Sequence, residues 1–381
     1  MTQAIRIETK NGDRLLAIRS FLATIMDKAG IDAMLVPTRM LVKNRIMPTL
    51  VSDAARLAEA DPLAPSFPVN AAQQLTRLTR NPSGGRLAAV LRPCEIRAFN
   101  ELVKLHQGQR DAVLIIGLDC PGALSNTDFK AFADRHDNLD DATQAFLDAT
   151  IAGGAADDIP ETTSACRACT HPLPDNADIG IALFGSDPTA GLEARAYTDS
   201  GIETLKGLDL AAAEATNTAH AKAADDILAA RKKYRATLFD RVAEATGDIP
   251  ALATYLADCV NCYNCRSACP VCYCTTCVFT TDTFRHDAFQ YLQWARRKGE
   301  IKMPTDTLFF HLTRMAHIAC ACVGCGQCTN ACPNDIPLSD LFTYVAEGTQ
   351  HAFGYAAGQD IATPPPMSRF EQEEYEEVVG L

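Results

Sequence analysis

The sequence is poor in basic residues and in long apolar stretches. It contains 35 Lys and Arg against 47 Asp and Glu, which gives a formal net charge of −12. Nucleic acids and anionic lipids have to be met by positive charge, so this balance argues against both as partners. No apolar run approaches the length of a membrane span, and the first 20 residues lack the apolar core of a secretory signal. We therefore expect a cytoplasmic chain without a membrane span.

Tryptophan is nearly absent, with one residue in 381, whereas cysteine is abundant, with 16. Disulfides are rare in a reducing compartment, so metal ligation is the better explanation for so many thiols. Twelve of them lie between Cys259 and Cys332, and this crowding favours ligands over nucleophiles. We therefore predict no catalytic residue. The other four cysteines are Cys94, Cys120, Cys166 and Cys169.

The first 200 residues alternate between strand-like and helix-like patterns. Short apolar runs suited to buried strands occur at 32–37, 86–91, 112–118 and 178–184. Helical apolar spacing occurs at 13–30, 69–80 and 94–106. This alternation predicts an α/β domain with a parallel or mixed sheet. We expect residues 192–207 to form a hairpin that turns at Asp199, Ser200 and Gly201.

A cysteine motif that ends in proline occurs twice in the last third of the chain. Its spacing is Cys-x2-Cys-x2-Cys-x3-Cys-Pro, from Cys259 to Pro270 and from Cys322 to Pro333. In bacterial two-cluster ferredoxins each copy gives three ligands to one [4Fe–4S] cluster and its fourth cysteine to the other. The motif therefore assigns one cluster to Cys259, Cys262, Cys265 and Cys332. It assigns the other to Cys322, Cys325, Cys328 and Cys269.

The alternative for this motif is a pair of zinc ribbons. A Zn(Cys)4 site takes two pairs of cysteines and needs neither a third cysteine two residues further on nor a Cys-Pro ending. Two full copies of the longer run therefore indicate iron–sulfur clusters, held in an α-helical ferredoxin-like domain.

These patterns divide the chain into an α/β domain, a helical linker, a two-cluster domain and a tail, at 1–207, 208–250, 251–347 and 348–381. Residues 278–319 form a helical insertion between the cysteine motifs and contain Trp294. We expect its aromatic residues to pack as core over the clusters, and His311 and His317 to be surface or capping residues. The proline- and glutamate-rich end of the tail is expected to be extended or disordered.

Four further cysteines lie near the two motifs, namely Cys272, Cys274, Cys277 and Cys320. They have two interpretations, either ligands of a further cluster or zinc ion, or small buried thiols. The four cysteines of the first half flank expected strands, where open α/β sheets build their sites. We interpret those four as ligands of a third [4Fe–4S] cluster.

The first half also carries these cysteines in recognisable surroundings. Cys94 follows Pro93 at a helix start, Cys120 begins Cys-x-Gly after a strand, and Cys166-x2-Cys169 precedes Ala-Asp-Ile at 177–179. In this order, over roughly residues 50–210, the segments resemble the coenzyme F420 hydrogenase/dehydrogenase beta-subunit family. With the twin motif, the chain resembles beta subunits of formate dehydrogenases and of related complexes that feed a heterodisulfide-reductase-type partner.

The resemblance implies an FAD on the α/β domain beside the third cluster, and a deazaflavin as hydride partner in archaeal members. No Gly-x-Gly-x2-Gly fingerprint is present, and the candidate flavin contacts are Gly185, Ser186 and Arg195. No residue pattern selects a deazaflavin over NAD(P) or over no diffusible carrier.

The expected function is electron transfer between a catalytic dehydrogenase subunit and a heterodisulfide-reductase-like or other acceptor. One alternative is an FAD-dependent dehydrogenase that acts directly on coenzyme F420 or NAD(P)H. Another is a relay whose α/β domain holds no flavin and serves for docking.

Overall fold

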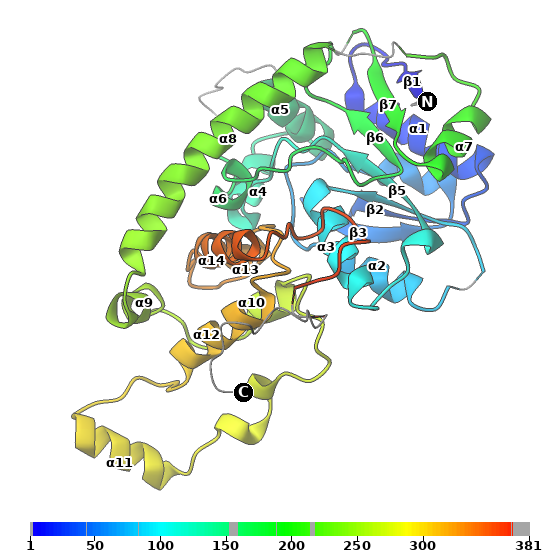
Figure 1. Cartoon of the computed structure of the whole chain (residues 1–381). Coiled ribbons are helices and arrows are strands. Elements are labelled where there is room, and N and C mark those ends of the chain that lie inside the picture. The colour runs from blue at the N-terminus through cyan, green and yellow to red at the C-terminus, as the bar shows by residue number, and fades with distance from the viewer. Residues whose placement is uncertain are drawn as a thin grey trace.

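The computed structural model describes residues 3–42, 44–82, 84–151, 159–187, 189–213, 218–366 and 368. Within these residues the first half forms a seven-stranded mixed sheet in the order β1-β7-β6-β5-β4-β2-β3 (Figure 1). The strands are β1 Ala4–Ile7, β2 Ala33–Arg39, β3 Ile46–Val51, β4 Leu87–Leu91, β5 Val113–Leu118, β6 Ile179–Ala182 and β7 Leu192–Ala196. The central strands β2, β4, β5 and β6 are parallel, and antiparallel strands close both edges. The predicted α/β fold is confirmed.

Helices cover both faces of this sheet. They are α1 Arg14–Lys28, α2 Ala72–Thr79, α3 Pro93–Lys104, α4 Asn126–Ala133, α5 Leu139–Ile151, α6 Ser164–Arg167 and α7 Asp199–Gly207, with short 3₁₀ helices η1 Ala54–Glu59 and η2 Arg110–Ala112. Successive residues of a strand point to opposite faces. On β4, Ala88 and Val90 therefore pack into the core with α1, whereas Ala89 and Leu91 pack with α2 and α3.

The expectation of a hairpin at 192–207 is wrong. Strand β7 pairs with β1 and β6, and the chain then enters helix α7 at Asp199. Thr198 begins this helix because its side chain accepts a hydrogen bond from the Gly201 amide at 3.2 Å. Polar residues of this kind serve as turn formers and as helix N-caps alike, and here the N-cap is formed.

The second half of the described chain is helical. Its elements are α8 Thr218–Ala245, α9 Ile249–Tyr255, α10 Asn264–Ala268, η3 Val278–Thr280, η4 Asp282–Phe284, α11 Ala288–Lys298, α12 Thr307–Ile318, α13 Gln327–Asn330 and α14 Leu338–Ala352. The long helix expected after residue 208 is confirmed as α8, whose 28 residues run along the flank of the molecule (Figure 1). At 1.5 Å per residue it is about 42 Å long, so it spans both halves of the chain.

The cysteine-rich half packs against the α2–α3 face of the sheet and shares one apolar core with it. Phe310 of α12 and Leu341 of α14 belong to the same buried cluster as Phe99 of α3. Arg97 of α3 is buried, and its guanidinium donates to the Ala357 carbonyl at 2.7 and 3.0 Å. A Cβ at position 358 would lie 2.3 Å from the Arg97 carbonyl oxygen, so only glycine allows this approach. The two halves are therefore joined tightly.

A buried polar cluster closes the same junction. Glu101 is fully buried, and one of its oxygens accepts hydrogen bonds from the Tyr355 hydroxyl at 2.7 Å and from the Gly358 amide at 2.6 Å. Lys104 is also within 2.8 Å of this oxygen. These contacts tie residues 355–358, which follow α14, to helix α3.

We expect Tyr355→Phe to lower the free energy of unfolding by about 1 to 2 kcal/mol, because it removes a donor from a buried carboxylate. Anaerobic denaturant unfolding of protein with full metal content measures this change. Tyr273→Phe, at an exposed tyrosine, is the matched control and should leave the free energy unchanged. Equal stabilities of the two variants would contradict the role given to the hydroxyl.

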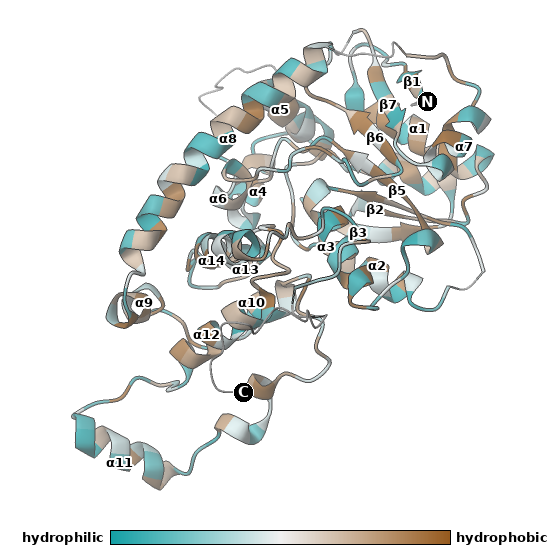
Figure 2. Ribbon diagram, in the orientation of Figure 1, coloured by the Kyte–Doolittle hydropathy of each residue, from teal (hydrophilic) through white to brown (hydrophobic). Residues whose placement is uncertain are grey.

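The insertion at 278–319 divides into a packed part and an exposed part. Phe279 and Phe310 are buried and in ring contact, as expected for core packing. For α11 the expectation is wrong, because none of its residues is buried, and Phe289 and Leu292 are 65% and 57% exposed. The helix projects away from the body with apolar and polar residues side by side (Figure 1 and Figure 2), and among the described residues only its Trp294 side lines a cavity with other elements. Over the described residues, no helix is both long and apolar enough to cross a membrane.

Candidate iron–sulfur centres

The first group of cysteines lies at the carboxyl edge of the parallel strands. Cys94 follows β4, Cys120 follows β5, and the two strands are adjacent in the sheet, so both loops end at one place. Helix α6 brings Cys166 to the same edge, and Cys169 follows that helix. All four thiols line one cavity. We call it the sheet-edge site, made of Cys94, Cys120, Cys166 and Cys169.

The start of α3 is fixed by a buried carboxylate next to Cys94. Glu95 accepts hydrogen bonds from the backbone amides of Ala71 and Arg92, both at 2.8 Å. The side chain of Arg92 is held by the Ala64 and Ser66 carbonyls at 2.6 and 3.0 Å. These bonds hold Cys94 rigidly at the cavity wall and bring a guanidinium to it.

The sheet-edge thiols have few partners for a negative charge of their own. Burial raises the pKa of Cys94 and of Cys166, so free thiolates are disfavoured there. Donors near them include the Ala123 amide, 3.3 Å from the Cys166 sulfur, the His171 amide, 3.4 Å from the Cys169 sulfur, and Arg92, 3.7 Å from the Cys120 sulfur. Four thiols around one enclosed space fit an iron–sulfur cluster, whose iron stabilises the thiolates that burial disfavours.

The twin motif folds twice into the same loop. In the first copy Asn261 and Tyr263 have φ of 49° and 61°, and in the second Gly324 and Gly326 at the same places have φ of 68° and 79°. This left-handed backbone on both sides of the middle cysteine turns the chain around the site. Short helices, α10 and α13, then start in each copy and contact each other. The two loops therefore face one another.

The first-motif site is the name we give to Cys259, Cys262, Cys265 and Cys332. Burial raises the pKa of Cys265 to about 11, opposed by the Arg314 guanidinium and helped by the nearby thiolates of the other three. The Cys332 thiol thus lies beside the first copy although it belongs to the second.

The second-motif site is the name we give to Cys269, Cys322, Cys325 and Cys328. These four thiols line one cavity together with Val271 and Phe342, so Cys269 lies with the second copy. Burial raises the pKa of Cys325 to about 12. The structure therefore brings together both sets of four thiols that the motif predicts, with the last cysteines exchanged, and each set fits a cubane cluster. Ligation itself stays a prediction.

Two residues that contact the first-motif thiols were not predicted from the sequence. His311, expected at the surface, is fully buried with its Nε2 3.3 Å from the Cys259 sulfur. Arg314, one turn further along α12, is 3% exposed and donates to the Cys265 sulfur at 3.0 Å and to the Cys265 carbonyl at 3.2 Å. The rings of Phe310 and Phe342 lie against its guanidinium. His317 is exposed, as expected.

The signal that could have found these two residues is their spacing. A histidine and an arginine three positions apart share one face of a helix, and α12 ends two residues before Cys320. The expectation for His311 was wrong because the insertion folds back over the first-motif site.

The remaining thiols do not form an obvious fourth site. Cys272 hydrogen-bonds to Cys269, whereas Cys320 lies near the Glu101 carboxylate, which raises its pKa after burial. Cys274 is exposed and Cys277 is half-buried. Across the described residues, no three His, Cys, Asp or Glu side chains converge closely enough to hold a single metal ion. A fourth metal site at Cys272, Cys274, Cys277 and Cys320 stays a prediction.

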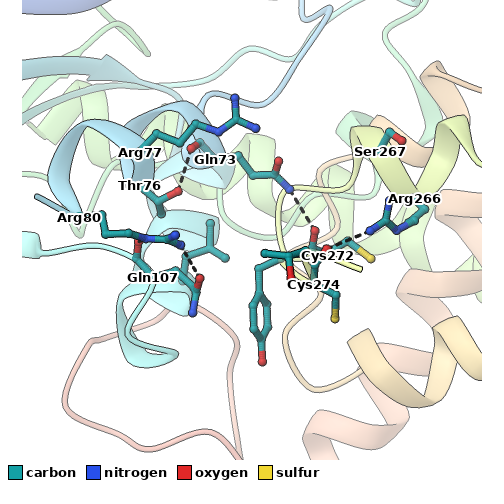
Figure 3. A pocket seen from close by; sticks show the side chains of 12 residues that line it. Gln73, Thr76, Arg77, Arg80, Gln107, Arg266, Ser267, Cys272 and Cys274 are labelled. Atoms are coloured by element: carbon teal, nitrogen blue, oxygen red, sulfur yellow. Dashed lines mark hydrogen bonds between the residues drawn. The ribbon is translucent and has the colours of Figure 1, made fainter. Parts of the chain in front are cut away.

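Cys272 and Cys274 instead line an open cleft between α2 and the loop after the first motif (Figure 3). The amide of Gln73 donates to the Cys269 carbonyl at 2.9 Å, and to the Pro270 and Cys272 carbonyls at 3.3 Å. These bonds attach the cysteine loop to the α/β half.

The residues predicted to contact flavin are engaged within the chain. A Cβ on Gly185 would lie 2.6 Å from the Ala219 carbonyl, so this glycine allows α8 to pack closely. The Ser186 hydroxyl donates to the Leu183 carbonyl at 2.7 Å, and Arg195 forms an ion pair with Glu193. The packing of α8 accounts for Gly185 without a ligand, and flavin contact at these residues stays a prediction.

The three sites follow one another through the molecule. Cys325 of the second-motif site also lines the sheet-edge cavity, and its charge adds to the effect of burial on the pKa of Cys94. Arg97 lines a small cavity between Cys169 of the sheet-edge site and Cys322 of the second-motif site. A Cβ at Gly326 would lie 2.7 Å from the Ala165 side chain, so the two sites are in direct contact.

Two family models match separate parts of this chain. Residues 84–206 match the family model for the C terminus of the coenzyme F420 hydrogenase/dehydrogenase beta subunit, and residues 255–336 match a 4Fe–4S dicluster domain. The F420-dependent formate dehydrogenase subunit beta of Methanocaldococcus jannaschii is 23% identical over 92% of this chain and 93% of its own length. The F420-dependent formate dehydrogenase 1 subunit beta of Methanococcus maripaludis is 25% identical over 74% of this chain and 75% of its own length.

A chain of the F420-reducing [NiFe] hydrogenase complex from Methanosarcina barkeri, with 13% identity, covers 65% of this chain and 94% of its own length at a TM-score of 0.43. The two family models match separate parts of one polypeptide, and each part contains the cysteine sites described above. Residues 84–206 therefore belong to the coenzyme F420 hydrogenase/dehydrogenase beta-subunit family and are joined in this chain to a 4Fe–4S dicluster domain.

Proposed function

We propose that this chain is an iron–sulfur electron-transfer subunit of a formate dehydrogenase- or hydrogenase-type complex. The observation that carries the proposal is the succession of three four-thiol sites, from the sheet edge through the second motif to the first. When bound, each [4Fe–4S] cluster accepts and releases one electron at a time. The names of the two formate dehydrogenase relatives support the type of complex.

The residues of the chain contribute burial, positive charge and fixed spacing. Arg92 lies at the sheet-edge site, Arg97 between the sheet-edge and second-motif sites, and Arg314 at the first-motif site. Buried guanidinium groups stabilise the negative charge that a reduced centre gains. The contact of Gly326 with Ala165 keeps neighbouring sites at one separation.

The proposed partners lie at the two ends of this relay. A catalytic dehydrogenase subunit is at one end, and a heterodisulfide-reductase-like or other acceptor is at the other, in a cytoplasmic complex. A second candidate function is that of an FAD-dependent dehydrogenase that acts directly on coenzyme F420, favoured by the name "F420-dependent" that both relatives carry.

We expect anaerobically purified protein to contain about 12 iron atoms per chain with matching sulfide, because three cubane clusters hold four irons each. Cys120→Ala with Cys166→Ala should lower this number by about four. A content near 16 would place a fourth cluster among Cys272, Cys274, Cys277 and Cys320. Two or more zinc ions with little iron would overturn the electron-transfer proposal.

The same purified material separates the two candidate functions. Denaturation and analysis of the supernatant for FAD should give about one per chain if hydride chemistry takes place on this subunit. Full iron content with no flavin leaves the relay function and removes direct dehydrogenation. Reduction of coenzyme F420 by the isolated chain, with a reduced viologen dye as the electron donor, would establish the second candidate.

A further inference from the structure

A positively charged cleft lies beside the second-motif site and has no role in the relay described above. Its volume is about 390 Å³, and it lies between α2 and residues 266–275. Arg77 and Arg80 come from the α2 side and Arg266 from the opposite wall (Figure 3). Among the described residues that line it, none is Asp or Glu, although the chain as a whole has a net charge of −12. The cleft is thus a local concentration of positive charge on an acidic protein.

Two of the three guanidinium groups are held in place by the chain itself. Arg80 donates to the Gln107 carbonyl at 3.2 Å, and Arg266 donates to the Cys274 carbonyl at 2.9 Å. Arg77 is exposed and makes no hydrogen bond or ion pair with the residues that the structure describes. Each arginine therefore has donors left for an external anion, and a planar guanidinium matches the oxygens of a phosphate group.

We propose that this cleft binds the phosphate groups of a small soluble molecule. Its volume lies within the range of small-molecule sites, roughly 300 to 1,000 Å³. The hydroxyl group of Thr275 supplies a neutral donor in the same cleft. Tyr273, whose side chain is 43% exposed, offers a ring to an aromatic base attached to the phosphates.

The bound molecule lies next to the proposed relay. Cys272 lines the cleft and hydrogen-bonds to Cys269 of the second-motif site. This adjacency to electron transfer rests on the proposed function, whereas phosphate binding rests on the cleft alone. A protein with full iron content and no phosphate binding would therefore overturn this inference and leave the relay intact.

The test uses the anaerobically purified full chain, with inorganic pyrophosphate and ADP as separate probes in titration calorimetry. We expect saturable binding of pyrophosphate to one site, weakened by added salt because the contacts are ionic. Arg77→Gln with Arg80→Gln should weaken binding about tenfold or more, since each lost contact is charge-assisted. The matched control is Arg241→Gln with Arg296→Gln, which removes the same charge from exposed positions outside the cleft.

The two probes also distinguish the sources of the phosphate. Tighter binding of ADP than of pyrophosphate, with the difference abolished by Tyr273→Ser, identifies a nucleotide. Equal binding of the two probes supports a phosphate ester without a recognised base. No saturable binding, or equal loss in the cleft variant and in its control, overturns the proposal.

Discussion

Alanine at Cys332 should remove the cluster of the first motif, although Cys332 belongs to the second. The reason is that its thiol lies beside Cys259 and Cys265. The iron content of double variants tests the assignment of Cys332 to this cluster. Cys332→Ala combined with Cys259→Ala should lose about four irons, no more than Cys332→Ala alone, because both residues hold the same cluster.

The complementary pair tests the other site. Cys332→Ala with Cys322→Ala should lose about eight irons, because these residues belong to different clusters. Cys269→Ala with Cys322→Ala should again lose only about four. The exposed Cys274→Ala is the control and should lose none if the fourth site is absent. The reverse pattern, with Cys332 and Cys322 sharing one loss, would show that each motif builds its own cluster.

Arg314→Gln should lower the reduction potential of the first-motif cluster most, that of the second-motif cluster less, because its charge also acts on Cys328, and that of the sheet-edge cluster hardly at all. The guanidinium is buried, lies 3.0 Å from the Cys265 sulfur and stabilises negative charge there. A hydrogen bond to a charged group contributes about 1.5 to 3 kcal/mol, which corresponds to a shift of about 60 to 130 mV for one electron. Anaerobic redox titration followed by EPR spectroscopy measures it.

Two further variants separate the charge from the packing of this side chain. Arg314→Lys keeps the positive charge and should restore much of the potential, although lysine cannot reproduce both hydrogen bonds. Arg285→Gln, an arginine in the same insertion with exposed surroundings, should leave the potential as it is. An unchanged potential in Arg314→Gln at full iron content would contradict the assignment.

Features that depend on short stretches of sequence could be predicted. The central strands are short apolar runs because both of their faces are covered, as Ala88 and Ala89 on opposite sides of β4 show. The twin motif fixes its own loop, since the cysteine spacing determines where the chain must turn. The fold class and the grouping of the thiols could therefore be predicted from the sequence.

Features that depend on packing between distant segments could not be predicted from the sequence. Thr198 could begin a helix or precede a turn, and only the pairing of β7 with β1 and β6 decides between them. His311 and Arg314 meet Cys259 and Cys265 because α12 folds back over the first motif. Helix α11 has exposed apolar residues at helical spacing, like a core helix, but this pattern does not determine whether another element of the chain packs against them.

The contact between α10 and α13 affects which parts of this protein can vary in evolution. These two helices flank residues 269–326, which include the insertion at 278–319, so this stretch is a loop whose ends are held together. The entropy cost of closing a loop rises only with the logarithm of its length, by about 0.6 kcal/mol for each doubling. The exposed part around α11 can therefore lengthen, shorten or be replaced at little cost in stability, provided that α12 keeps its place. Selection for new partners can act on α11 while the thiol sites stay as they are.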